Sequence, residues 1–126
     1  MLAYQLPIGA IGYSEFHHSL ATANLIDSST VDDGWSAVNR GSYSSGAGHS
    51  ATANVFWNTS GTGTLRSLQY ATGYVIGTAP ELTVATDPTQ AFGSAGAGTD
   101  PVDWTEGLGQ ADLLDPPSLY EAQLAS

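Results

Sequence analysis

Short runs of apolar and β-branched residues alternate with turn residues along most of the chain. Val, Ile, Thr, Tyr and Trp are concentrated in these runs, and Gly or Asp-Pro lies at their ends. Runs of this length and composition predict β-strands. The expected strands are 21–26, 35–39, 51–58, 64–70, 73–77 and 82–86.

The first of these strands recurs 30 positions further along the chain. The sequence Ala-Thr-Ala-Asn at 21–24 is repeated at 51–54, and each copy is followed by two large apolar residues. Turn residues separate the copies, at 32–34 and in the Gly-rich run 41–48. This period predicts the stacked coils of a β-solenoid, with the two copies in register on neighbouring coils or strands. A β-sandwich is the alternative, because its short strands occur at similar intervals.

Three asparagines lie at or near the ends of the expected strands, namely Asn24, Asn54 and Asn58. Asparagine side chains hydrogen-bond to nearby backbone groups and favour turns. We therefore expect these amides to cap turns or to stack as a ladder along the coils.

Composition agrees with a β-fold and narrows the choice of partners. The chain has 126 residues, which suits one domain spanning 1–126. Only 11% of residues are charged, and the formal net charge is −10 with no lysine. Such a surface repels phosphate backbones and anionic lipid headgroups, which argues against nucleic-acid binding. The absence of cysteine excludes disulfides and thiolate chemistry.

The apolar stretch 2–11 is interrupted by Gln5 and Pro7 and lacks a basic flank. It therefore predicts neither a signal peptide nor a membrane span. If the protein is secreted, its signal would have to precede Met1, so we expect a mature piece or a fragment of a longer chain.

The composition changes after the last expected strand. Regular coils are predicted over about 17–86, an acidic loop excursion over 87–117, and a terminal helix over 118–125. Trp104 is expected to anchor the excursion to the body. Ser118 and Glu121 form an S-x-x-E capping box that predicts the helix start. We expect this helix to lie against the body or to cover the open end of the solenoid.

Four segments resemble the C-terminal coils of secreted bacterial right-handed parallel β-helix proteins of the pectate-lyase-like superfamily. These segments are Val55–Thr59, 65–70, 74–78 and 116–124, and the resemblance extends over roughly 20–124. It implies an extracellular or cell-surface β-helix, in a superfamily where many members bind or cleave acidic or neutral polysaccharides.

The resemblance also suggests candidate catalytic residues. Polygalacturonase-like members use paired aspartates, a Gly-His-Gly turn and an Arg-x-Lys motif. Asp32, Asp33, His49 and Arg66 follow in that order here, but the histidine turn is Gly-His-Ser and lysine is absent. An inverting hydrolase needs two opposed carboxyl groups, whereas an Asp-Asp-Gly sequence is also typical of a plain turn. A lyase would depend on Arg40 or Arg66, the only cationic side chains apart from histidine.

The leading hypothesis is a non-catalytic extracellular β-helix domain that acts as a scaffold or a glycan-contact surface. Its expected contact residues are aromatic: Trp35, Trp57, Tyr70 and Tyr74. The alternatives are a polysaccharide-cleaving hydrolase or lyase, and a self-assembling structural subunit that pairs strands end to end. No cofactor or metal site is predicted, although calcium would suit the acidic groups Asp27, Asp32 and Asp33, or Asp100 and Asp103. The expected partners are polysaccharide or a second copy, without membrane insertion.

Overall fold

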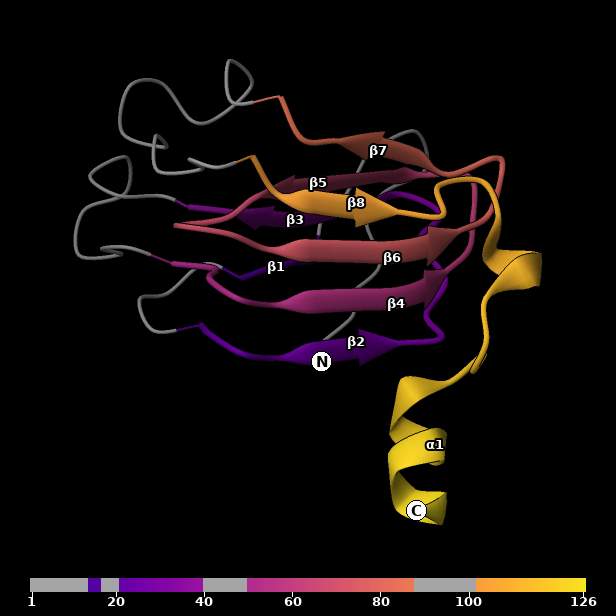
Figure 1. Cartoon of the computed structure of the whole chain (residues 1–126). Helices are drawn as coiled ribbons and strands as arrows, with labels where there is room; N and C mark the ends of the chain where they lie inside the picture. The colour runs from indigo at the N-terminus through magenta and orange to yellow at the C-terminus, as the bar shows by residue number, and fades with distance from the viewer. Residues whose placement is uncertain (1–13, 17–20, 40–49, 88–101) are drawn as a thin grey trace.

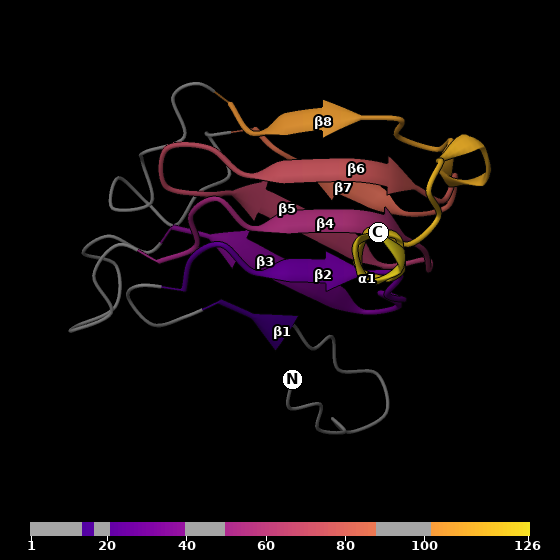
Figure 2. The same cartoon turned by 60° about the horizontal axis from the view of Figure 1, so that its bottom comes forward.

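Eight strands form two parallel sheets in the computed structural model, which describes residues 14–16, 21–39, 50–87 and 102–126 (Figure 1 and Figure 2). One sheet has the order β1-β3-β5-β7, and the other has the order β2-β4-β6-β8. Successive strands therefore alternate between the sheets. The strands are β1 (Ser14–Glu15), β2 (Leu25–Asp27), β3 (Gly34–Val38), β4 (Val55–Thr59), β5 (Thr64–Leu68), β6 (Tyr74–Thr78), β7 (Thr83–Ala85) and β8 (Trp104–Glu106).

Every pair of neighbouring strands in these sheets is parallel. The expectation of an all-β fold is confirmed. An antiparallel β-sandwich is wrong, because its sheets are built from hairpins and Greek-key connections that pair strands in opposite directions.

The 30-residue repeat corresponds to strand register. Leu25, Ile26 and Asp27 of β2 pair with the residues 30 positions later in β4, and an isolated bridge joins Thr22 to Thr52. The prediction that the two copies lie in register is therefore confirmed. The next step is shorter, since Val55 of β4 pairs with Tyr74 of β6, and the step from Tyr74 to Trp104 returns to 30 positions.

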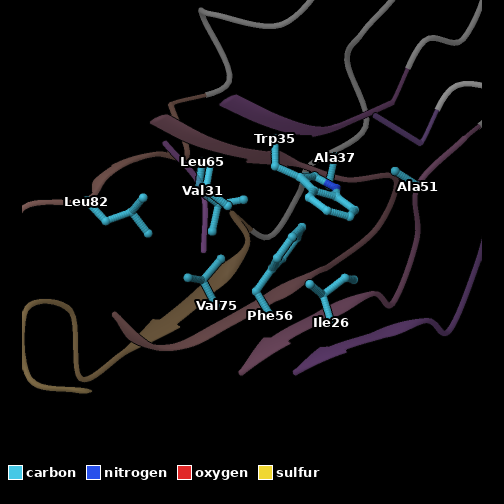
Figure 3. Close-up of a cluster of buried hydrophobic side chains, with 9 residues drawn as sticks. All are labelled: Ile26, Val31, Trp35, Ala37, Ala51, Phe56, Leu65, Val75 and Leu82. Atoms are coloured by element: carbon cyan, nitrogen blue, oxygen red, sulfur yellow. The ribbon is translucent and has the colours of Figure 1, made fainter. Parts of the chain in front are cut away.

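The core lies between the two sheets and is built from alternate residues of each strand (Figure 3). Ile26, Phe56 and Val75 point inward from one sheet and face Trp35 and Leu65 of the other. The rings of Trp35 and Phe56 meet edge to face at 5.9 Å. Burial of such side chains stabilises the fold by about 1.5–3 kcal/mol each.

The burial of Trp35 corrects one expectation. Its side chain is only 9% exposed and belongs to the core cluster. Phe16 packs against the same ring, with the centroids 5.8 Å apart. Protein atoms therefore cover the ring that a sugar would have to stack on, and Trp35 is a core residue instead of the glycan-contact residue expected from the sequence.

A series of hydrogen-bonded polar side chains lies beside the starts of the strands in the β2-β4-β6-β8 sheet, and it is buried except at Asn24. The Asn24 N–H donates to Asn54 Oδ1 at 2.9 Å, and the Asn54 N–H donates to Gln69 Oε1 at 2.9 Å. The Gly73 N–H then donates to Asp103 Oδ1 at 3.0 Å. We call these four side chains, Asn24, Asn54, Gln69 and Asp103, the polar ladder. The expected stacking of Asn24 on Asn54 is confirmed, and Nδ2 of Asn24 also donates to Oδ1 of Asn54 at 2.8 Å.

The segment predicted as a loop excursion contains a regular strand. β8 pairs with β6, so part of 87–117 continues the sheet. Trp104 does not anchor this segment, because its side chain is 59% exposed. The adjacent Asp103 does so instead: it is 4% exposed and accepts hydrogen bonds from Ser67 Oγ and from the Gln69 and Gly73 N–H groups.

The terminal helix α1 (Leu119–Ala125) begins where the capping box predicts, because Ser118 Oγ accepts a hydrogen bond from the Glu121 N–H at 3.1 Å. Its position differs from one expectation. The chain after β8 runs back past the ends of β6 and β4, and α1 lies below β2 in Figure 1, at the end of the stack opposite to β8. The helix therefore does not cover the edge formed by β7 and β8. Among the described residues, no helix has the length and apolar character needed to cross a membrane.

Candidate functional site

An exposed apolar row crosses the outer face of the β2-β4-β6-β8 sheet. Its members precede the inward-pointing core residues, so they point to the opposite face of the strands. Strand register places them side by side as Leu25, Val55, Tyr74 and Trp104. We call this set the outer row. Leu25, Tyr74 and Trp104 are exposed, and the Trp104 ring is the most exposed of the four.

A second row lies two residues further along the same strands. It consists of Asp27, Trp57, Ile76 and Glu106, which are also register partners. The two apolar members stand in the middle, and a carboxylate stands at each end. This second row differs from the outer row because the returning chain packs beside it.

The returning chain, residues 107–118, forms a strap along the ends of the strands. The Gly109 N–H donates to Thr78 Oγ1 at 3.0 Å. Trp57 Nε1 donates to the Pro116 carbonyl oxygen at 3.0 Å, and Asn58 Nδ2 donates to the Pro117 carbonyl oxygen at 2.9 Å. Leu114 packs where Gly77 has no side chain. The strap thus contacts β6 and β4 in turn.

Asp27 of β2 holds the lower end of the strap. Its Oδ2 accepts hydrogen bonds from Ser118 Oγ at 3.0 Å and from the Tyr120 N–H at 2.6 Å. Desolvation acts to raise the pKa of this carboxyl group, but the hydrogen bonds from Tyr120, Ser28, Ser118 and Leu119 together lower the pKa below its ordinary value. The charged form of Asp27 is therefore the form that binds the strap.

The strand corners that receive the strap share an unusual backbone conformation. Ser28, Asn58, Gly77 and Gly107 are register equivalents, and all four have φ between 54° and 69°. Asparagine and glycine adopt this left-handed conformation most readily. At Gly77, an added Cβ would also approach Leu114 Cδ2 to within 2.6 Å. These corners therefore leave room for the strap beside the sheet.

A groove of about 420 Å³ lies between the strap and the second row. This size falls within the range of small-ligand pockets. Its lining combines apolar, carboxylate and amide groups: Trp57, Ile76, Gly77, Glu106, Gly107, Gln110, Leu113, Leu114 and Asp115. We call it the strap groove. Trp57, expected from the sequence as a contact residue, therefore lines the groove.

The outer row and the strap groove together have the chemistry of a polyhydroxylated ligand site. Aromatic rings offer flat apolar faces, on which the C–H faces of sugar rings can stack. Carboxylate oxygens accept hydrogen bonds from hydroxyl groups, and amides can both donate and accept. The outer row supplies Tyr74 and Trp104, and the groove supplies Glu106, Asp115 and Gln110.

The structure does not bring the candidate catalytic residues into one described site. Asp32 and Asp33 are exposed in the turn between β2 and β3, where Asp32 Oδ1 accepts a hydrogen bond from the Thr62 N–H at 3.3 Å. Arg66 lies in the middle of β5. Asp33 is level with the residue before β5, so about 10 Å of strand separates the two positions. His49 lies outside the described residues, as does Arg40.

The candidate calcium ligands are similarly dispersed. No group of three or more His, Cys, Asp or Glu residues that could hold a metal ion occurs in the described part of the chain. Asp27 binds the strap, and Asp103 belongs to the polar ladder. Asp100 lies outside the described residues. Burial of Asp103 raises the pKa of its carboxyl group, although hydrogen bonds from Ser67, Gln69 and Gly73 act in the opposite direction.

Three features of this face were not predicted from the sequence: the position of Trp104 in the outer row, the position of Glu106 beside the groove, and the strap. The available signal was the pattern at 103–107, since Asp-Trp-Thr-Glu-Gly matches the polar, apolar and turn positions of Asn-Leu-Ile-Asp-Ser at 24–28. Tyr70 is exposed, but it lies in the turn before β6 and not in either row.

Comparison with known proteins gives no relative for this chain: a scan against protein-family models, a search of curated proteins and a search of solved structures each found no match.

Proposed function

We propose that this chain is a non-catalytic parallel β-helix domain that contacts a neutral polysaccharide through its outer row and strap groove. The observation that carries the proposal is the pairing of Tyr74 and Trp104. The two aromatic side chains are register partners on adjacent strands and are both exposed to solvent. Large exposed aromatic groups in one row are costly to hydrate unless a ligand covers them.

Several features support the β-helix part of the proposal. Strands alternate between two parallel sheets, and equivalent residues repeat on successive strands of each sheet. A parallel β-helix combines both features, and crossovers between parallel strands favour the right-handed form. The resemblance to secreted β-helix proteins of the pectate-lyase-like superfamily stays a prediction, and an extracellular or cell-surface location belongs to the same proposal.

Charge selects a neutral glycan over a polyuronate. The net charge of the chain is −10, and Glu106 and Asp115 border the groove. This surface would repel a polyanionic glycan, whereas a neutral glycan experiences no such electrostatic repulsion. The carboxylates can accept hydrogen bonds from sugar hydroxyls, and these charge-assisted bonds are stronger than neutral ones.

Affinity electrophoresis against a panel of soluble polysaccharides provides the test. The panel contains neutral β-glucans, xylans, mannans and galactans together with one polyuronate. We expect retardation by at least one neutral member and none by the polyuronate. Trp104→Ala should weaken binding about tenfold or more, because burial of an aromatic face and its stacking contribute more than about 1.4 kcal/mol.

Tyr74→Ala is the second test variant, and Tyr120→Ala is its matched control. Tyr120 is an exposed tyrosine on α1, outside both rows. Tyr74→Ala should weaken binding to the same glycan, and Tyr120→Ala should leave it unchanged. Binding that survives both Tyr74→Ala and Trp104→Ala would contradict the proposed contact surface, as would the absence of binding to every neutral glycan of the panel.

A further inference from the structure

The two ends of the described sheets present complementary edges. Each sheet has four strands, so β1 and β2 end the sheets on one side and β7 and β8 end them on the other. Edge strands carry backbone N–H and C=O groups that can pair with a further strand. The polarity of the strands is the same at both ends because all neighbours are parallel.

The hydrogen-bond series along the stack shows what each end offers. The Val55, Tyr74 and Trp104 N–H groups donate to the carbonyl oxygens of residues 24, 54 and 73 on the preceding strand. The next acceptor in this series is the Asp103 carbonyl oxygen, and the next donor of equivalent position is the Leu25 N–H of another copy. The polar ladder continues in the same way, because the Asp103 N–H would meet the Asn24 side-chain oxygen of that copy.

We infer that copies of this chain associate head to tail, with β8 of one copy beside β2 of the next. In that arrangement Trp104, Thr105 and Glu106 pair with Leu25, Ile26 and Asp27 of the neighbour. The outer row and the polar ladder would then each continue across the junction. A head-to-tail contact of this kind does not close on itself, so it produces open stacks instead of a single dimer.

A hollow at the β2 edge supports a second copy as the occupant. It has a volume of about 720 Å³ and is lined by Leu25 and Asp27 from one face of β2 and by Ile26 from the other. Residues from both faces of an edge strand can line one hollow only if the hollow runs along that edge. Trp35 also lines it, and among the described residues its buried Nε1–H has no hydrogen-bond partner.

Helix α1 gives a second reason for a partner at this end. It forms one side of the hollow through Tyr120 and Glu121, yet it has no buried residue. A helix of seven residues is not stable without packing. Leu124 on this helix is 67% exposed. A docked copy would cover apolar surface of this kind.

Negative charge opposes the association and makes it depend on salt concentration. Each copy carries a net charge of −10, and the junction would set Glu106 opposite Asp27 of the neighbour. Like charges on paired strands are destabilising. Added salt screens this repulsion, so association should strengthen with ionic strength. Glu106→Gln removes the direct pair and should lower the dissociation constant about two- to fivefold.

Two proline variants test the arrangement, because each blocks one end only. The Trp104 N–H donates to the Gly73 carbonyl oxygen. In a parallel strand the backbone groups of the next residue point the other way, so the Thr105 N–H faces the free edge. By the same reasoning, the Leu25 N–H faces the free edge of β2. Proline is tolerated at edge positions whose N–H faces outward.

Sedimentation velocity of the full chain at low and high salt measures the outcome. The unmodified chain should form species larger than a monomer as salt increases. Thr105→Pro alone and Leu25→Pro alone should each stay monomeric, since every head-to-tail contact needs one intact β8 end and one intact β2 end and each variant has only one of the two. An equimolar mixture should form heterodimers, because the β2 end of Thr105→Pro fits the β8 end of Leu25→Pro. Their formation also shows that both variants fold.

A chain that stays monomeric at both salt concentrations would overturn the inference. Proline variants that assemble as extensively as the unmodified chain would do the same, since the contact would then lie elsewhere. Glu106→Gln is exposed and does not threaten folding. An unchanged dissociation constant for this variant would contradict the pairing of β8 with β2.

Discussion

The 30-residue and 19-residue steps between register-paired strands of the β2-β4-β6-β8 sheet place a polar side chain at the same position with different residues. In the 30-residue steps, the residue just before the strand supplies its own polar side chain, as Asn54 and Asp103 do. In the 19-residue step from β4 to β6, that position is Gly73, and Gln69 supplies the side chain from four residues earlier. An added Cβ on Gly73 would lie 1.8 Å from Gln69 Nε2. Each step therefore places a polar side chain at the same point of the polar ladder, although the residue that supplies it differs in sequence position.

The largest expected effect comes from filling the space that Gln69 occupies. Gly73→Ala should displace the Gln69 side chain, which removes the acceptor of the buried Asn54 N–H and breaks the hydrogen bonds of the Gln69 amide to the Asn54 carbonyl oxygen and Ser67 Oγ. Unpaired buried groups cost about 1–3 kcal/mol each, so we expect a loss of about 3 kcal/mol in the free energy of unfolding, measured by urea denaturation.

A double-mutant cycle sharpens this prediction. In a Gln69→Ala background the clash is absent, so Gly73→Ala should cost at least about 1 kcal/mol less than it does in the unmodified chain. Additive effects of the two substitutions would contradict the idea that Gln69 takes the place of a side chain at position 73.

Removal of the Asp103 side chain, the last member of the polar ladder, should have the next largest effect on the free energy of unfolding. Asp103→Ala leaves Ser67 Oγ and the Gln69 and Gly73 N–H groups without an acceptor, and we expect a loss of about 2–3 kcal/mol. Asp112→Ala, at an exposed aspartate of the 3-10 helix η3 (Ala111–Leu113), is the matched control and should change stability by less than about 0.5 kcal/mol. Equal losses for the two variants would rule out a special role for the buried carboxylate.

The two aspartates also predict opposite pH dependence. Burial raises the pKa of Asp103, so in the folded state this carboxyl group stays protonated at pH values above its ordinary pKa of 3.8. As pH falls through its folded-state pKa toward 3.8, the group therefore favours folding more. For Asp27, desolvation raises the pKa but the hydrogen bonds from Tyr120, Ser28, Ser118 and Leu119 lower it on balance. Its contribution is present above 3.8 and is lost as pH falls further, through its folded-state pKa.

The strap should therefore loosen in acid before the sheets do. The amide NMR signal of Tyr120, which donates to Asp27, should move toward its random-coil position as pH falls below 3.8, while the Val75 amide stays protected. Asp27→Asn should show the loosened strap at neutral pH and cost about 1 kcal/mol or less, because the site is close to solvent. A Tyr120 signal that is independent of pH would mean that other contacts hold the strap.

Local sequence signals explain which parts of the fold could be predicted. The strands and the register of 21–26 with 51–56 could be predicted because Ala-Thr-Ala-Asn is repeated intact, and the α1 start because Ser118 and Glu121 form a local signal. β8 was not predicted, because Asp103 stands where the repeat has asparagine and because the neighbouring sequence is rich in Gly and Pro. Trp35 and Trp104 look alike in sequence, but only the partner sheet makes one a core residue and leaves the other exposed.

The course of the strap depends on long-range contacts that no local pattern encodes. Trp57 reaches Pro116 across 59 positions, and Asp27 reaches Tyr120 across 93. A capping box predicts that a helix begins at Ser118, but it does not determine which end of the molecule the helix meets. For this reason α1 lies at the β2 end of the sheets and not at the β8 end, which precedes it directly in the chain.

Fluorine NMR of the protein labelled with 5-fluorotryptophan tests the proposed contact surface most directly. The three tryptophans occupy three environments, since Trp35 is in the core, Trp57 lines the strap groove and Trp104 is exposed in the outer row. On titration with a neutral polysaccharide that retards the protein, the Trp104 resonance should shift most, the Trp57 resonance less, and the Trp35 resonance not at all. A Trp104 resonance that stays in place while the glycan binds would contradict the account.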